Sequence, residues 1–225
     1  MPLNIGPIVT AIKQLNEKTT KRNFVQSIDL NVKVKDVDLK QPKNRIAAEV
    51  YLPHEITKTR KICVIGTGDL GVRAKNLGLD VLDKADLDNL KGDKKAAKKY
   101  VKSTDIFIAG VDLMPILAKS LGPVLGPSGK MPIGPPKGKG IIPTNADLNP
   151  LIEQYKKMVR IRLRNNLVVN CKVGTEEMTP QQLAENIQSV INFLEGTFEH
   201  GSRNIGTLRV KKTMGPSIKI ITKAD

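Results

Sequence analysis

Hydrophobic and polar residues alternate in several short segments near both ends of the chain. A period of two is typical of strands that bury one face and expose the other. Helices are predicted over residues 7–19 and 179–194, and the second begins with Thr179, Pro180 and Gln182, a capping-box sequence. The alternating segments, each predicted to be a strand, are residues 28–34, 46–52, 160–164, 167–173, 207–211 and 218–221.

The middle of the chain has a different pattern. Residues 62–65 are continuously apolar, as expected for a strand that is covered on both faces. Residues 121–140 contain six Gly and five Pro and are predicted to be a loop with local turns. The other segments alternate between extended and helical, which indicates an open α/β sheet. Extended segments are predicted at residues 79–82 and 105–109, and helices at 72–77, 93–102 and 112–121.

These two patterns predict two domains of different class, one α+β and one α/β. The α+β domain would combine residues 1–55 with 157–225, because neither terminal part alone is large enough to fold comfortably. The α/β domain, residues 56–156, would be inserted between them. The chain then crosses twice between the domains, so we expect a hinge that includes Pro53 and His54.

The charge of the chain narrows the choice of partners. Its 225 residues carry a formal net charge of +15. Such an excess favours a polyanion as partner, most often a nucleic acid and less often a membrane surface. No apolar segment approaches the roughly 18 residues that a membrane-spanning helix requires, so we expect a cytoplasmic protein without membrane contact.

Neither a metal site nor a catalytic site is predicted. The two cysteines, Cys63 and Cys171, fall on the apolar sides of predicted strands and are far apart in the sequence. The two histidines, His54 and His200, have no acidic or Cys neighbour at the spacing of metal ligands. Buried free thiols and structural histidines are therefore expected.

One motif suggests a nucleotide cofactor. Residues 66–71 read G-T-G-D-L-G, which matches the G-x-G-x-x-G of dinucleotide-binding folds and follows a predicted strand. The helix after it has barely two turns before Gly78, and no catalytic group follows. We therefore interpret Gly66, Gly68 and Gly71 as a turn cluster and expect no cofactor. A nucleotide-binding α/β protein is the alternative.

A strand and a turn near the C-terminus are candidates for contact with RNA. Residues 203–223 contain six Lys or Arg and no Asp or Glu. Thr207, Arg209 and Lys211 share the polar face of the predicted strand, and T-M-G-P at residues 213–216 predicts a turn. Hydroxyls and cations on an open strand face suit an RNA backbone. An edge strand kept soluble by its cations explains the same residues, and this segment alone does not decide between the two.

A second basic feature is the predicted strand that carries Arg160, Arg162 and Arg164 on one face. No carboxylate occurs between residues 156 and 172, so the three guanidinium groups would repel one another unless anions bind there. We therefore expect them to contact phosphate. The Lys-rich residues 93–102 are interpreted instead as a solvated helix face.

Together these features resemble one family, the L-one family of large-subunit ribosomal proteins in its archaeal and eukaryotic form. Its members sit on the mobile side stalk of the large subunit, beside the tRNA exit site. The resemblance covers nearly the whole chain. Its most specific pieces are R-N-F at residues 22–24, L-P-H at 52–54, L-G-P-S-G-K-M-P at 125–132 and T-M-G-P at 213–216.

The resemblance implies an α+β domain from both termini and an inserted Rossmann-like α/β domain that binds no nucleotide. It implies a non-enzymatic protein of the cytoplasmic ribosome, monomeric when free, whose first domain binds large-subunit ribosomal RNA. It further implies transient contact with tRNA at the exit site, assistance in the release of deacylated tRNA, and repression of its own mRNA through a similar RNA site.

The resemblance also implies site residues. In the inserted domain it implies a secondary RNA contact at Gly126, Gly129 and Lys130, although Ser128 and Lys130 replace an Arg and a Leu of bacterial members. The family's contact residues match Phe24, Thr207, Thr213, Met214 and Gly215. With the basic residues added, the predicted RNA-binding set is Arg22, Phe24, Arg160, Arg162, Arg164, Thr207, Arg209, Lys211, Thr213, Met214 and Gly215.

Overall fold

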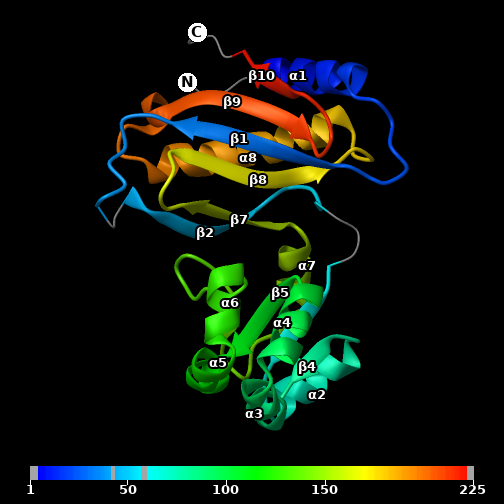
Figure 1. Ribbon diagram of the computed structural model, residues 1–225, viewed down its shortest axis with the longest axis vertical. Coiled ribbons are helices and arrows are strands. Elements are labelled where there is room, and N and C mark those ends of the chain that lie inside the picture. The colour runs from blue at the N-terminus through cyan, green and yellow to red at the C-terminus, as the bar shows by residue number, and fades with distance from the viewer. Residues whose placement is uncertain (1–4, 42–43, 57–59, 222–225) are drawn as a thin grey trace. The chain divides into compact units, whose positions relative to one another are not determined.

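The computed structural model of the protein describes residues 5–41, 44–56 and 60–221 (Figure 1). Its contacts divide the chain into two compact units, residues 1–57 with 157–225 and residues 58–156, which we call the first and the second unit. The sequence prediction placed these divisions after residues 55 and 156. The first unit combines helices with antiparallel strands and the second contains a parallel sheet, so the predicted mixed fold class is confirmed.

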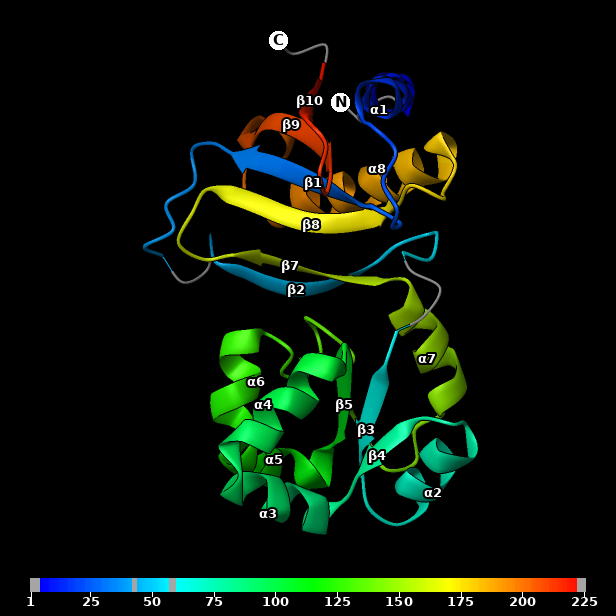
Figure 2. The same ribbon diagram turned by 45° about the vertical axis from the view of Figure 1, so that its right-hand side comes forward.

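The first unit is built on a four-stranded antiparallel sheet. Two helices, α1 (Ile5–Lys18) and α8 (Pro180–Thr197), pack against one face of it (Figures 1 and 2). A separate antiparallel pair is formed by β2 (Ile46–Tyr51) and β7 (Met158–Leu163). The 3-10 helix η3 (Gly201–Asn204) directly precedes strand β9. The strand order of the four-stranded sheet is β10 (Ser217–Ile220), β9 (Ile205–Lys212), β1 (Ser27–Val34) and β8 (Val168–Thr175).

The alternating sequence determines which face of this sheet is buried. In β1, the residues Ile28, Leu30, Val32 and Val34 point toward the helices and are at most 1% exposed. The apolar residues of β8, β9 and β10 and the apolar stripes of α1 and α8 join them in one core of mostly aliphatic side chains. The remaining residues of each strand therefore lie on the opposite face, which we call the open face.

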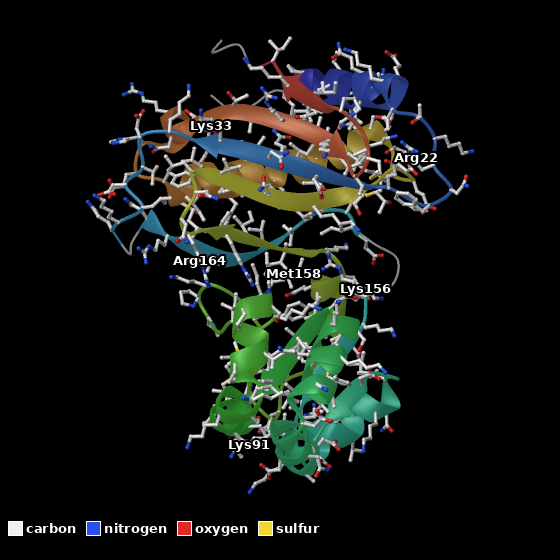
Figure 3. All side chains as sticks on the ribbon, in the orientation of Figure 1. Arg22, Lys33, Lys91, Lys156, Met158 and Arg164 are labelled. Carbon is white, nitrogen blue, oxygen red and sulfur yellow. The ribbon has the colours of Figure 1, made fainter. Side chains whose placement is uncertain are left out.

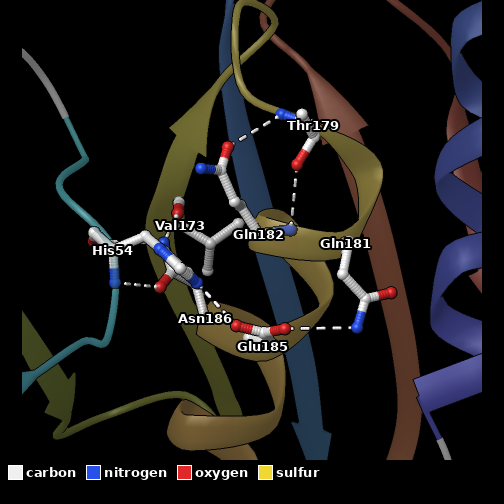
Figure 4. A network of polar contacts seen from close by, with 7 residues as sticks. All are labelled: His54, Val173, Thr179, Gln181, Gln182, Glu185 and Asn186. Carbon is white, nitrogen blue, oxygen red and sulfur yellow. Dashed lines mark hydrogen bonds and ion pairs between the residues drawn. The ribbon is translucent and has the colours of Figure 1, made fainter.

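Helix α8 begins with the capping box predicted from the sequence. The Thr179 hydroxyl accepts a hydrogen bond from the Gln182 backbone N–H at 3.3 Å, and Gln182 Oε1 accepts one from the Thr179 N–H at 3.1 Å (Figure 4). Pro180 occupies the first helical position, where its missing N–H costs nothing. These contacts confirm the predicted start of the helix.

The second unit is an open parallel sheet with the strand order β4 (Asp80–Leu82), β3 (Ile62–Ile65), β5 (Ile106–Gly110) and β6 (Ile141–Ile142). Every residue of β3 and β5 is buried, as expected for strands covered on both faces. Strand order reverses between β3 and β5, as in doubly wound folds. The helices are α2 (Asp69–Asn76), α3 (Lys84–Gly92), α4 (Lys94–Ser103), η2 (Val111–Leu113), α5 (Met114–Ser120), α6 (Gly122–Ser128) and α7 (Leu148–Lys156).

Two segments of the second unit differ from the sequence prediction. The predicted loop over residues 121–140 contains α6, because Leu121 and Leu125, one helical turn apart, are fully buried and outweigh the Gly and Pro content. Helix α3 was not predicted. Its capping box is made by Asp83 and Asp86, whose carboxylates accept each other's backbone N–H at 2.9 and 3.2 Å.

Replacing Thr179 tests the local start signal of α8. We expect Thr179→Ala to lower the free energy of unfolding of the first unit by about 1 kcal/mol, because one helix-end N–H loses its acceptor. Thr179→Ser, which keeps the hydroxyl, should retain most of the stability. Urea unfolding followed by circular dichroism measures both. Equal stability of the Ala and Ser variants would show that the cap contributes nothing.

Candidate nucleic-acid interface

Polar and charged side chains fill the open face of the four-stranded sheet. Strand register places them in two neighbouring rows that run across all four strands. These rows are Lys219–Arg209–Asn31–Asn170 and Ser217–Lys211–Asp29–Lys172. Four cations thus surround a single carboxylate, and Lys33 on β1 adds a further exposed cation (Figure 3). The predicted shared face of Thr207, Arg209 and Lys211 is present.

The carboxylate in these rows, Asp29, is held in an unfavourable state. Burial raises the pKa of Asp29 above its usual value, and the nearby Lys172 and Lys211 lower it by less than burial raises it. Its charged form is therefore incompletely compensated even between two lysines. The open face as a whole stays strongly basic and suits a polyanion.

At the end of β9 the chain turns next to the start of β1. Thr213 donates its backbone N–H to Ser27 O at 3.1 Å. The Thr213 hydroxyl also lies 3.2 Å from Ser27 N and 3.3 Å from Ser27 O. The following Met214 side chain is 61% exposed, and Phe24, shortly before β1, is 51% exposed. The turn and the segment before β1 therefore each present one large apolar side chain to the solvent.

A buried polar network supports this turn from below. Gln26, which is fully buried, donates its backbone N–H and its side-chain amide to the two carboxylate oxygens of Glu176 at 3.1 and 3.3 Å. Its side-chain oxygen accepts the Met214 backbone N–H at 3.2 Å. Lys212, only 7% exposed, completes the network with an ion pair to Glu176 at 3.4 Å. The network fixes the backbone position of Met214.

Sequence reasoning missed the three members of this network. One signal was available for Lys212, because the period of two places it on the same side as the buried Val210. A lysine at an inward position is rarely left without a partner. Gln26 and Glu176 gave no comparable signal, since they are 150 residues apart in the sequence.

Gly215 has a packing role in addition to the one predicted. A Cβ at this position would lie 2.8 Å from Thr19 Oγ1 and 3.0 Å from Thr19 Cγ2. Thr19 cannot easily move, because its hydroxyl donates to Leu15 O at 2.6 Å at the end of α1. Glycine is therefore required where the turn meets α1, whether or not RNA approaches there.

Strand β7 has the predicted alternation of buried apolar residues and arginines, but one of its arginines is paired with a carboxylate that was not predicted. Val159, Ile161 and Leu163 are buried, so Arg160 and Arg162 share the other face of β7, and Arg164 follows the strand in an exposed position. The absence of a neutralising carboxylate was predicted wrongly. Glu49 on β2, opposite Arg160 in the register, pairs with Arg160 at 3.0 Å.

This ion pair changes the role of Arg160. The Glu49 side chain is fully buried and that of Arg160 is 15% exposed, so the pair belongs to the structure of the β2–β7 ladder. Burial, and then the charges of Arg160 and Arg164, lower the pKa of Arg162. The charges of Arg160 and Arg164 thus disfavour a charged Arg162, and the phosphate contact predicted for Arg162 and Arg164 remains a prediction.

The remaining predicted RNA contacts are spread widely. Thr207 and Thr213 lie near opposite ends of β9, about 20 Å apart at the usual rise of a strand. Arg22 is exposed in the segment before β1 (Figure 3). The interface supported by the first unit is therefore an extended surface, from the open face to the turn at residues 213–215.

Of the three residues predicted to form a secondary RNA contact in the second unit, Lys130 has its ammonium hydrogen-bonded to the protein itself. The Lys130 ammonium donates to Val101 O at 2.8 Å and to Thr104 O at 2.5 Å, at the end of α4. These bonds cap the end of α4, and the RNA contact predicted for Lys130 remains a prediction. Gly129 has a φ of 72° and ends α6, while Gly126 is exposed with open space around it.

The residues predicted to form a hinge are anchored within the first unit. His54 N–H donates to Asn186 Oδ1 at 3.0 Å, and the His54 ring lies 2.6 Å from Glu185 Oε2 (Figure 4). Hydrogen bonds from His54 and then Gln181 lower the pKa of Glu185. Ile56 is buried in the core of the same unit. The hinge role of Pro53 and His54 remains a prediction.

The glycine cluster of the second unit is explained by packing. A Cβ at Gly66 would lie 2.7 Å from Leu70 Cδ2, and one at Gly71 would lie 3.1 Å from Gly66 O. Leu70, which is 1% exposed, packs directly against Gly66. The cavity beside these glycines measures about 10 Å³, no more than one water molecule needs and far below the 300 Å³ or more that is usual for ligand sites.

Among the residues that the structure describes, no group of three or more His, Cys, Asp or Glu side chains is placed to hold a metal ion. Within the same residues, no helix is both long and apolar enough to cross a membrane. Cys63 and Cys171 are buried free thiols, as expected, and burial raises the pKa of each to about 12.

Comparison with known proteins identifies the family. Residues 15–216 match the Ribosomal protein L1p/L10e family. The chain belongs to this family. It is 43% identical over 220 residues to the large ribosomal subunit protein uL1 of Pyrococcus abyssi, with 98% of each chain covered. It is 41% identical over 213 residues to that of Methanocaldococcus jannaschii, which covers 95% of this chain and 94% of the relative.

Membership in the L1p/L10e family confirms the resemblance read from the sequence, including its archaeal type. Hyperthermus butylicus has a further relative, 40% identical over 210 residues. All three are named as ribosomal proteins, which are structural rather than catalytic, so the expectation of a non-enzymatic ribosomal protein is also confirmed.

The buried ion pair between Glu49 and Arg160 predicts that removing one of its charges lowers the stability of the fold strongly. We expect Glu49→Gln to lower the free energy of unfolding by about 3 kcal/mol, because it leaves a mostly buried guanidinium without its counter-charge. Combining it with Arg160→Met should recover most of that loss. Urea unfolding measures all three proteins. If the double variant is as unstable as Glu49→Gln, the pair is not the cause.

The raised pKa of Asp29 predicts a pH dependence. The folded state holds the Asp29 proton more tightly than the unfolded state, so this carboxyl favours folding at low pH and opposes it once pH rises through its folded pKa. We therefore expect Asp29→Asn to be more stable than the wild type at neutral pH, with a difference that shrinks as pH falls toward 4. Urea unfolding across this range tests it, and a pH-independent difference would contradict it.

Proposed function

We propose that this protein is a structural component of the large ribosomal subunit that binds large-subunit ribosomal RNA through the open face and the turn at residues 213–215. The observation that carries the proposal is the pair of basic rows on the open face, which end beside a turn held by a buried network. Family membership supplies the class of RNA. The resemblance supports a location on the mobile side stalk beside the tRNA exit site.

The two parts of the surface do different work. Arg209, Lys211 and Lys219 contact phosphates and supply affinity that falls with salt. The turn supplies selectivity, since the exposed Met214 and Phe24 side chains pack on sugars or unstacked bases. Among the three arginines in and just after β7, the exposed Arg164 is the better phosphate contact and Arg160 the poorer, because Arg160 is paired with Glu49.

Thr213 can recognise RNA in spite of its contacts with the protein. A hydroxyl has one donor and two acceptor positions. The Thr213 hydroxyl donates to Ser27 O and accepts from Ser27 N, which leaves one acceptor position on an exposed residue. A ribose 2′-OH is a donor that matches this position and is absent from DNA.

The same surface supports a regulatory role. An mRNA segment that mimics the ribosomal site would compete for the open face and the turn, since one surface binds one RNA at a time. Free protein in excess of ribosomal RNA would then repress translation of its own mRNA. Transient contact with tRNA, assistance in the release of deacylated tRNA, and a monomeric free state are further proposals, which rest on the resemblance alone.

Replacing the hydroxyl of Thr213 tests the selectivity of the turn. We expect Thr213→Val to weaken binding to a transcript of the ribosomal stalk by about tenfold, the loss of one net hydrogen bond or slightly more. Binding to an unrelated folded RNA of equal length should not change. Filter binding across a salt series measures both RNAs.

Three variants serve as controls. Thr213→Ser should restore the preference for stalk RNA. Thr197→Val removes a hydroxyl that donates to Phe193 O at the end of α8, the helix that covers the buried face of the sheet and not its open face, and should have no effect. Arg209→Gln should weaken both RNAs alike and reduce the salt dependence by about one contact. If wild type binds both RNAs equally at every salt concentration, the proposed selectivity is wrong.

A further inference from the structure

Helix α4 of the second unit carries a row of lysines. Lys94, Lys95, Lys98, Lys99 and Lys102 are all exposed, and we call them the α4 lysine face. On the opposite side of the helix, Ala97 and Val101 pack into the core of the unit, and each is 2% exposed. Tyr100 lies half-buried, with its hydroxyl 3.3 Å from the Cys63 sulfur. The lysine face therefore contains only charged side chains and their aliphatic stems.

These lysines act against the stability of their own helix. Lys94 and Lys98, and likewise Lys95 and Lys99, are four residues apart, where like charges destabilise a helix. Lys94 and Lys95 also lie in the first turn, at the positive end of the helix dipole. Helices α2 and α3 follow the opposite rule, with Asp69 and Asp86 in their first turns.

Nearby acids do not neutralise the face. Asp93, the N-cap, accepts the backbone N–H groups of Lys95 and Ala96 at 2.8 and 3.1 Å and thereby serves the helix end. Asp105, just past the helix, accepts the Lys61 N–H at 3.1 Å. Within the described part of the chain, none of the five lysine ammonium groups lies at ion-pair distance from a carboxylate.

The helix is held in place at both ends despite this repulsion. Asp93 caps the start of α4. At the end of α4, the carbonyl oxygens of Val101, Lys102 and Thr104 accept hydrogen bonds from the Lys130 ammonium, which follows α6. Lys130 thus helps to position the lysine face. A rigid array of uncompensated cations is pre-organised for an anion.

We propose that the α4 lysine face is a second RNA contact, which binds phosphate groups without regard to base sequence. The inference rests on the proposed function, and it extends that function to a helix of the second unit. An ammonium is a point charge that suits phosphate, and the face offers no aromatic or amide group to read a base. From Lys94 to Lys102 it spans about 12 Å, enough for two or more phosphates. A membrane surface fits less well, because no exposed apolar side chain accompanies the lysines.

The test compares two variants of the full chain that lose the same charge. One carries Lys94→Gln, Lys95→Gln, Lys98→Gln and Lys99→Gln on the α4 lysine face. The other carries Lys75→Gln, Lys84→Gln, Lys119→Gln and Lys137→Gln, four exposed lysines scattered over the same unit. Each is titrated with a long transcript of large-subunit ribosomal RNA that contains the stalk, across a salt series.

We expect the α4 variant to bind about tenfold more weakly near 0.15 M salt and to lower the slope of log affinity against log salt by about two. The scattered variant should stay within about threefold of wild type. Equal losses in the two variants would overturn the proposal, since net charge alone would then explain them. Binding of the α4 variant to the transcript at wild-type strength would overturn it as well. In a parallel titration with anionic lipid vesicles, a loss confined to the vesicles would also overturn it.

A second measurement separates this inference from the proposed function. Because Cys63 and Cys171 are buried, Lys98→Cys introduces a thiol that can be labelled with an iron chelate, and Lys119→Cys is the matched control. Hydroxyl radicals from position 98, and not from position 119, should cleave the bound transcript. Failure of Thr213→Val to lose selectivity would count against the turn, whereas absence of cleavage from position 98 would count against the α4 lysine face.

Discussion

The first unit depends on one constraint: its sheet must bury a continuous face of aliphatic side chains under α1 and α8. With aromatic residues at only 3% and no Trp, the core is made almost wholly from Ile, Leu and Val. The period of two in β1, β8, β9 and β10 then directs every second residue away from that core. Because the open face adds little apolar burial, its composition can serve a ligand, and cations occupy it.

Buried charges support the first unit at two places, and at one of them, Lys212, alternation alone would predict an apolar residue. Lys212 points inward and pairs with Glu176, and Glu49 is buried on β2 and pairs with Arg160. Such pairs are often no more stabilising than apolar residues of the same volume. Their value here is position, since the Lys212–Glu176–Gln26 network holds the Met214 backbone and the Glu49–Arg160 pair orders β7.

Much of the fold was predictable because it is encoded locally. Alternation located β1 and β9, and Thr179 with Gln182 located the start of α8. The errors have long-range causes. Helix α6 forms despite its glycines and prolines because Leu121 and Leu125 find a core, and Glu49 meets Arg160 across 111 residues of sequence. The packing of Gly215 on Thr19 could not be anticipated either, since no local pattern joins the end of α1 to this turn.

The placement of charge implies that the free protein is not in its most stable state. Burial raises the pKa of Asp29, Arg162 lies between two other arginines in the sequence, and the lysines of α4 repel one another. An RNA that binds only the folded chain adds stability as RT ln(1 + [RNA]/Kd), about 2.7 kcal/mol at a hundredfold excess over Kd. Phosphates beside these cations also remove the repulsion itself. The net charge of +15 thus destabilises the free chain by repulsion and strengthens the binding of a polyanion. This explains why cations gather at positions where the stability of helix and sheet alone would disfavour them.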